Sequence, residues 1–337
     1  MTTTQTRESK IRTRTTGPPA DEASPPGGRR PARRQRLHRH SPAGQVVLAY
    51  LDTQAARLSD LDLAVRLDQP DAVHQMRVTV RRLRSALQSF TGFLRQEDTQ
   101  HLRAELKWLG AVLGSARETE VLADYLHTGL RAVPMELVLG PAQARVTAHF
   151  APLEVSTRRA VLEALDSERY RALSAELGRL LDRPPLTPAA TEPAAEVLPP
   201  AVRHAYRRTS RRMDRARQAP TGQARDEALH EARKAAKRAR YAAEAARPAL
   251  GKKDGRKARR FANRMKHVQS ALGTHQDMVD ARTAAREIGV QAHLAGENAF
   301  SFGLLHERAR NQALACQAEA YGAWRHARRK ARWLPRS

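Results

Sequence analysis

Apolar residues recur at intervals of three and four positions along most of this chain, from about residue 42 to 183 and again from about 201 almost to the C-terminus. This spacing gathers apolar side chains on one face of an α-helix, and alternating runs typical of strands are lacking. The pattern therefore predicts an all-α protein. Proline and glycine indicate helix ends in the first segment at Gln69-Pro70-Asp71, Gly92, Gly114 and Val133-Pro134.

Two stretches break the helical pattern. Residues 184–200 are rich in proline, which lacks the backbone N–H and clashes with the preceding helical turn. They are predicted to be a linker between a first half of about 42–183 and a second half of about 201–334. Residues 1–40 are rich in Thr, Pro, Gly and Arg and hold almost no large apolar residues, which predicts a disordered basic arm.

A short cationic motif occurs once in each half. It reads His74-x-x-Arg77-x-x-x-Arg81-Arg82-x-Arg84 and then His230-x-x-Arg233-x-x-x-Lys237-Arg238-x-Arg240, an offset of 230 − 74 = 156 residues. Each basic position of the first copy holds Arg or Lys in the second. A duplicated unit explains this agreement better than chance does.

A second pair of segments supports the duplication. An apolar stretch with an embedded lysine precedes a glycine and then an acid, in the order Lys107, Gly114, Glu118 and again Lys266, Gly273, Asp277. The offset is 266 − 107 = 159 residues, close to the first one. Each half has a size that fits a bundle of about four helices.

Each copy of the motif is predicted to form an amphipathic helix with one cationic face. With about 100° between successive residues, His74, Arg77, Arg81 and Arg84 share a stripe opposite an apolar face. The second copy places its cations in the same way, while alanines make up most of its apolar face. Arg82 and Arg238 flank the two stripes.

The charge of the chain indicates what these stripes bind. Lys and Arg number 60 against 35 Asp and Glu, a formal net charge of +25, which points to a polyanionic partner. Like charges three and four residues apart repel on a helix, and a bound polyanion would offset that repulsion. The candidate binding residues are His74, Arg77, Arg81, Arg82, Arg84, Lys107, His230, Arg233, Lys234, Lys237, Arg238, Arg240 and Lys266.

Other features bound the class of protein. A single cysteine, Cys316, excludes a disulfide framework and favours a reducing, cytoplasmic compartment. No apolar run approaches the roughly 20 residues that span a bilayer, and we expect neither membrane insertion nor a signal peptide. Aromatic residues make up only 4% of the chain, which weighs against a protein that stacks single-stranded bases.

The quoted motifs, with Tyr241, resemble the CHAD domain, the conserved histidine α-helical domain, over about residues 41–334. The resemblance implies two four-helix bundles related by a pseudo-twofold axis, with a basic cleft that binds inorganic polyphosphate and an association with polyphosphate granules. Some members are joined to CYTH-type enzymes, but Glu118-Thr119-Glu120 here lacks the lysine that would continue the CYTH signature. Two departures are Glu118, where the family usually has Asp, and the alanine-rich second basic helix.

Three functions remain open at this point. A non-catalytic polyphosphate-binding module is favoured. A nucleic-acid-binding protein is the second interpretation, although no helix-turn-helix, zinc finger or aromatic platform is present. A metal-dependent phosphohydrolase is the third, but the sequence lacks a Walker loop and an H-E-x-x-H motif. We expect no enzyme, metal or cofactor, and we expect the acids Glu118, Glu120, Asp277 and Asp280 to pair with arginines.

Overall fold

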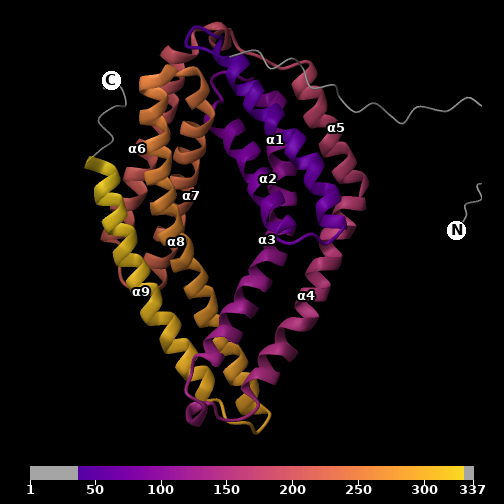
Figure 1. Cartoon of the computed structure of the whole chain (residues 1–337), viewed down its shortest axis with the longest axis vertical. Coiled ribbons are helices and arrows are strands. Elements are labelled where there is room, and N and C mark those ends of the chain that lie inside the picture. The colour runs from indigo at the N-terminus through magenta and orange to yellow at the C-terminus, as the bar shows by residue number, and fades with distance from the viewer. Residues whose placement is uncertain (1–36, 330–337) are drawn as a thin grey trace, which may run out of the picture. The chain divides into compact units, whose positions relative to one another are not determined.

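The computed structural model describes residues 37–329, and these form α-helices joined by short loops and 3₁₀ turns, with no strand in that range (Figure 1). The predicted all-α fold is confirmed. The predicted arm over residues 1–40 lies outside the described residues except for its last four positions. The helices are α1 (Ala43–Arg66), α2 (Ala72–Ser89), α3 (Gln96–Arg131), α4 (Ala142–Asp166), α5 (Glu168–Asp182), α6 (Ala194–Gln218), α7 (Gln223–Ala246), α8 (Gly251–Leu294) and α9 (Phe300–Arg329).

The order of the helices repeats along the chain. Helices α1, α2 and α3 correspond to α6, α7 and α8, and α4 with α5 corresponds to α9. Figure 1 shows α1, α2 and α5 on one side of the helical region and α6, α7 and α9 on the other. Each of α1, α2 and α3 also packs against its own counterpart. Such reciprocal contacts are what a twofold axis between two similar units requires.

Buried apolar residues form two hydrophobic clusters, and both draw on the two halves of the chain. The larger contains Leu83 and Leu109 from the first half together with Ala236 and Phe261 from the second. The smaller lies at the far ends of the α3–α4 and α8–α9 hairpins, where Phe150 and its neighbours meet residues of α8 and α9. The two halves are therefore held together by shared cores.

Gly114 does not end a helix, contrary to the prediction. It lies in the middle of α3, and Gly273 lies in the middle of α8. A Cβ atom at Gly114 would stand 3.7 Å from the guanidinium of Arg77, and one at Gly273 would stand 3.5 Å from that of Arg233. Each glycine thus allows an arginine of the neighbouring helix to lie against the backbone, although glycine in a helix is less stable than alanine.

The predicted linker of 184–200 is also too long at its C-terminal end. Helix α6 begins at Ala194, so Pro199 and Pro200 lie inside it. Each removes one backbone hydrogen bond of the helix. The helix continues because Leu198 and Val202, which flank the two prolines, are fully buried in the larger cluster, and tertiary packing can override local propensity.

The remaining linker is fixed to the first half by backbone hydrogen bonds. The N–H of Arg95 donates to the carbonyl of Pro185 at 2.9 Å, and the N–H of Ala194 donates to the carbonyl of Ser41 at 2.9 Å. A Cβ at Gly44 would stand 2.9 Å from the Cβ of Ala190, so the linker lies directly on α1. These contacts set where the second half begins relative to the first.

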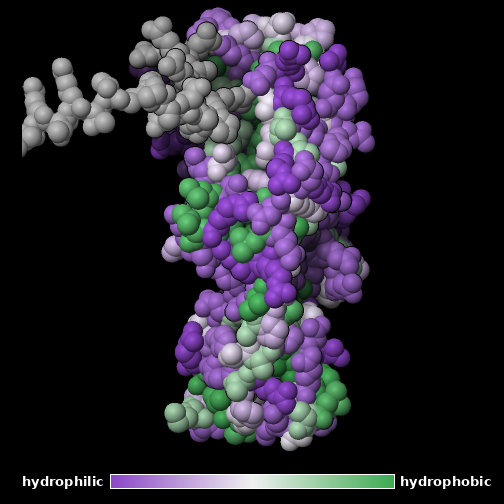
Figure 2. Space-filling model, turned by 90° about the vertical axis from the view of Figure 1, so that its right-hand side faces the viewer, coloured by the Kyte–Doolittle hydropathy of each residue, from purple (hydrophilic) through white to green (hydrophobic). Residues whose placement is uncertain are grey.

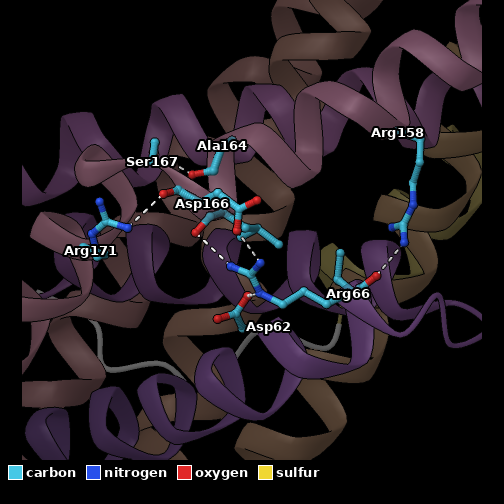
Figure 3. Close-up of polar contacts among 9 residues, drawn as sticks. Asp62, Arg66, Arg158, Ala164, Asp166, Ser167 and Arg171 are labelled. Atoms are coloured by element: carbon cyan, nitrogen blue, oxygen red, sulfur yellow. Dashed lines mark hydrogen bonds and ion pairs between the residues drawn. The ribbon is translucent and has the colours of Figure 1, made fainter.

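Polar contacts join the end of α1 to the junction of α4 and α5 (Figure 3). Arg66 donates from Nε to Asp62 at 2.9 Å and also pairs with Asp166. Arg158 donates to the carbonyl of Val65 at 2.7 Å. Ser167 caps α5, because its Oγ accepts a backbone N–H of the first turn at 3.2 Å. The cap marks the start of α5 directly after α4, whereas the second half has the single helix α9 at this place.

The surface of this region is mostly polar. Figure 2 shows hydrophilic residues over most of the face that carries α4 and α5, with small separate apolar spots. Val155 on α4, 60% exposed, is one of the larger apolar side chains at the surface. Within residues 37–329, no helix combines the length and the apolar character needed to cross a membrane.

Candidate functional site

The cationic stripes of α2 and α7 meet where these two helices pack against each other. The charges of Arg77 and Arg81 on α2 act directly on Arg233 and Lys237 on α7. We call these four residues the central cluster. The structure thus brings together two matched cations from each copy of the repeated motif, so the duplication produces one joint site.

Acids on the two long helices lie near two members of the central cluster, and one of these acids forms an ion pair there. Arg77 donates from Nη2 to Glu118 at 2.8 Å. Arg233 lies beside Asp277, the residue that corresponds to Glu118 in the second half. Glycine and acid are one turn apart in both α3 and α8, and Arg77 lies across Gly114 where it reaches Glu118. The expectation that Glu118 pairs with an arginine is confirmed.

Arg81, Arg233 and Lys237 differ from Arg77. Among residues 37–329, none of the three is within ion-pair distance of a carboxylate. The Nε atoms of Arg81 and Arg233 are buried and have no hydrogen-bond partner among the described residues. Donors of this kind are costly to leave unpaired, by about 1–3 kcal/mol each. The cluster therefore offers unsatisfied donors on a half-buried cationic surface.

Burial and mutual repulsion shift the protonation of the cluster. Burial, and then the charges of Arg233, Arg81 and Arg77, lower the pKa of Lys237 from 10.5 to about 6. Burial also lowers the pKa of Arg233 and of Arg77, although both guanidinium groups stay charged. An anion in contact with the cluster would oppose all of these shifts.

His74 and His230 lie one turn before Arg77 and Arg233 in their helices. Burial is the main cause of the lowered pKa of each imidazole, and nearby cations add to it. Nδ1 of His230 is 2.8 Å from Oε1 of Gln276. Nδ1 of His74 is buried and has no such partner among the described residues. His74 instead feels the charge of Arg117, the residue that corresponds to Gln276, so the two histidines differ in their surroundings.

Arg82 and Arg240 form a separate group around Glu244. Arg240 donates from Nε to Oε1 of Glu244 at 2.7 Å, and Arg82 lies 3.6 Å from Oε2 of the same carboxylate. Both guanidinium groups also stand over the ring of Tyr241, at 5.3 and 5.7 Å from its centroid. These two predicted binding residues therefore share one internal counter-ion.

Arg84 and Arg238 form a third group on the opposite side of the α2–α7 contact. Burial lowers the pKa of Arg238, and so do the charges of Arg208 and Arg84. None of these three arginines has an ion pair with a carboxylate in the described part of the chain. Arg208 was not among the predicted binding residues. The signal for it was the arginine-rich run on α6 from 207 to 217, which has no matching run in α1.

The three predicted lysines outside the central cluster are exposed. Lys234 forms an ion pair of 2.8 Å with Glu231 and is not part of the cluster. Lys107 and Lys266 have no hydrogen bond or ion pair of their side chains within residues 37–329. Each lies two helical turns before the glycine of its long helix, about 10 Å away along the axis. They would touch a ligand only if it extends beyond the central cluster.

Within residues 37–329, no group of three or more His, Cys, Asp or Glu side chains could hold a metal ion. The acids near the cluster have other contacts: Glu120 pairs with Arg117 at 2.6 Å, and Asp280 accepts from Gln276 at 2.9 Å. What the arrangement offers chemically is a set of fixed hydrogen-bond donors and positive charge.

Comparison with known proteins identifies the family of this chain. Two curated relatives, the uncharacterized proteins MT2285 and Rv2226 of Mycobacterium tuberculosis strains CDC 1551 / Oshkosh and H37Rv, are each 33% identical over 284 residues. The match covers 84% of this chain and 53% of each relative, so the chain spans about half the length of these proteins.

Two solved structures have a similar fold. PptA from Streptomyces chartreusis superposes with a TM-score of 0.70 at 23% identity, and the match covers 85% of this chain and 100% of that one. The CHAD domain from the plant Ricinus communis superposes with a TM-score of 0.63 at 25% identity, covering 87% and 97%. The family model described as the CHAD domain matches residues 49–286, a range that contains the central cluster and both long-helix glycines. The chain therefore belongs to the CHAD domain family.

Proposed function

We propose that this chain binds inorganic polyphosphate in the central cluster, without catalysing a reaction. The observation that carries the proposal is the convergence of Arg77, Arg81, Arg233 and Lys237 from the two copies of the motif. Three of these cations, Arg81, Arg233 and Lys237, have no ion pair with a described carboxylate, and a ligand of high negative charge would relieve the mutual repulsion of the four residues. The CHAD family resemblance supports the same ligand.

The dimensions of the site favour a polymer over a single phosphate. From His74 to Arg81 a helix rises by about 10 Å, and the matching stripe of α7 lies alongside. Arginine presents a planar fork of donors that fits phosphate oxygens, and a neighbouring lysine adds a mobile charge. Exposed Lys107 and Lys266 would contact phosphates farther along the chain. Association with polyphosphate granules, as the family resemblance implies, is part of the proposal.

A nucleic acid is the second candidate ligand, on the strength of the net charge of +25. The central cluster offers no aromatic ring on which a base could stack, and its cations are recessed between two helices. A flexible chain of phosphates without bases or sugars reaches such a site more readily than a stiff duplex does. A phosphohydrolase would need a nucleophile or a metal, and three of the described acids near the cluster, Glu118, Glu120 and Asp280, pair with arginine or glutamine.

Titration with long-chain polyphosphate tests the proposal. The matched protein has Arg77, Arg81, Arg233 and Lys237 all replaced by Glu, with its fold checked by circular dichroism. We expect tight binding by the natural sequence and no measurable binding by the variant. Duplex DNA at equal phosphate concentration should not displace the polymer. Undiminished affinity in a folded variant would refute the proposed site, and displacement by DNA would favour the second candidate. Phosphate release with Mg²⁺ or Mn²⁺ present would refute the non-catalytic role.

A further inference from the structure

The two ends of the α2–α7 contact should be equivalent in a duplicated fold, and they are not. The correspondence of α1 with α6 follows from their buried positions, which agree at an offset of 194 − 43 = 151 residues: Val47 with Leu198, Leu51 with Val202, Gln54 with Ala205 and Leu58 with Thr209. The motif gives an offset of 156 for α2 and α7. Each residue at one end can therefore be matched with its counterpart at the other.

One end is filled and has an internal counter-ion. The ring of Tyr241 is 2% exposed and lies under the guanidinium groups of Arg82 and Arg240, which share the carboxylate of Glu244. Tyr50 of α1 is partly buried in the same group with its hydroxyl inside, and this burial, modified by Arg82 and Glu244, raises its pKa. Two aromatic rings and one acid thus occupy this end.

The other end has a smaller or neutral residue at each of these three positions. Tyr50 is matched by Ala201, Tyr241 by Ser85 and Glu244 by Gln88. A cavity of about 310 Å³ lies here, and we call it the side pocket. Its lining consists of Gln88, Ser89, Thr91, Ala201, His204, Ala205, Arg208 and Arg238. The loss of two aromatic rings explains why this end is hollow.

Basic residues are present at both ends, whereas the acid is present only at the first. Arg238 corresponds to Arg82, and Arg84, close to Arg238, corresponds to Arg240. Arg208 lines the pocket from α6. None of the three has an ion pair with a described carboxylate. The nearest acid that affects Arg238 is Glu231, which is already paired with Lys234 at 2.8 Å. The pocket therefore has room, positive charge and no internal counter-ion in the described region.

We propose that the side pocket binds a single phosphoryl group, with Arg208 and Arg238 as its main ligands and Gln88 as a neutral hydrogen-bonding wall. Arginines around a small hollow suit a compact oxyanion, which accepts several charge-assisted hydrogen bonds at once. The phosphoryl group is either inorganic phosphate or the terminal unit of a longer chain. The site is distinct from the central cluster and does not depend on the proposed function of that cluster.

Binding of inorganic phosphate, measured by calorimetry, tests the pocket. The measurement uses a full chain that carries Arg81→Gln and Lys237→Gln, so that phosphate bound by the central cluster contributes little. Gln88→Glu restores the acid found at the other end and should weaken phosphate binding by about 10-fold or more, because a charged acceptor replaces a neutral group. Arg208→Gln should weaken phosphate binding similarly, and the variant should fold because this side chain is exposed.

Gln291→Glu is the matched control, since it makes the same charge change at an exposed position of α8 far along the chain. It should leave phosphate binding unchanged. Equal effects of Gln88→Glu and Gln291→Glu, or no effect of Gln88→Glu and Arg208→Gln, would overturn the proposal. In the natural background, loss of long-chain polyphosphate affinity in Gln88→Glu would assign the pocket to a chain end. Unchanged polymer affinity with weaker phosphate binding would assign it to free phosphate.

Discussion

The two basic helices carry the same cations on different cores. Helix α2 buries Met76, Val80 and Leu83, whereas α7 buries alanine at the equivalent positions, Ala232, Ala236 and Ala239. The central cluster nevertheless contains matched residues of both helices. The cations are therefore positioned by helix register, by a glycine on the neighbouring helix and by an acid one turn beyond it, and the size of the core residues can vary without moving them.

Exchanging core residues between the two helices should have the largest effect. Leu83 corresponds to Ala239, and both are fully buried. Leu83→Ala would leave a cavity and lower the free energy of unfolding by about 2–5 kcal/mol. Ala239→Leu would overpack the core beside α7 and lower the free energy of unfolding by about 1–3 kcal/mol. Urea denaturation measures both. A gain in stability from Ala239→Leu would show that the core beside α7 is loosely packed, which would contradict the expected loss.

Replacing a cation of the cluster by an apolar residue should stabilise the free protein. Lys237→Met removes a buried amine whose protonation is opposed by burial and by the neighbouring arginines, and we expect a gain of about 1–4 kcal/mol. Because the pKa of Lys237 falls from 10.5 to about 6 on folding, the unfolded chain binds more protons between these values. The stability of the natural sequence should therefore rise with pH from about 6 to 10. Thermal unfolding across this range checks the trend, which Lys237→Met should flatten.

Binding should reverse the shift of the same lysine. A polyanion beside Lys237 raises its pKa again, so binding near pH 7.5 takes up a proton and weakens as pH rises from about 6 to 8. Titration calorimetry in buffers of different ionisation enthalpy measures the uptake. Lys237→Met should abolish most of it, while the histidines account for any remainder. Binding without proton uptake would contradict the assigned state of this lysine.

The smallest effect is expected at Lys234. It belongs to the second basic helix but pairs with Glu231 on the exposed side. Lys234→Gln should change both stability and polyphosphate affinity only slightly, with a stability change within about 0.5 kcal/mol. Measuring it beside Arg81→Gln compares a solvated cation with a recessed one on helices of the same type. A loss as large as that of Arg81→Gln would mean that the ligand covers the whole helix.

Sequence periodicity was sufficient for the helical class and for the repeated basic helices, because a register-matched stripe depends only on local spacing. It failed at Gly114 and at Pro199 with Pro200, where residues that usually end helices lie inside them. Gly114 makes room for Arg77, and the helix continues through the prolines because Leu198 and Val202 are buried. Both reasons are contacts between distant segments, which no local pattern contains.

The division of the cations into three groups likewise could not be predicted from a single sequence. Arg81, Arg82 and Arg84 are adjacent on α2, yet they belong to the central cluster, the Glu244 group and the side-pocket group, respectively. Helical angles separated Arg82 from the stripe but placed Arg84 on it. The crossing of α2 with α7 and the approach of α6 decide which cation has an internal counter-ion. Both contacts depend on tertiary packing.

The most direct test of the central cluster is the salt dependence of polyphosphate binding in Arg81→Gln/Lys237→Gln. Neither residue has an ion pair in the described region, so the fold should survive. The control, Lys252→Gln/Arg256→Gln, removes two exposed cations at the start of α8. We predict that the cluster variant loses about 10-fold or more in affinity and that its plot of log affinity against log salt is shallower by about 1–2. The control should remain close to the natural protein. Equal losses in both variants would mean that net charge alone binds the polymer, which would contradict the account.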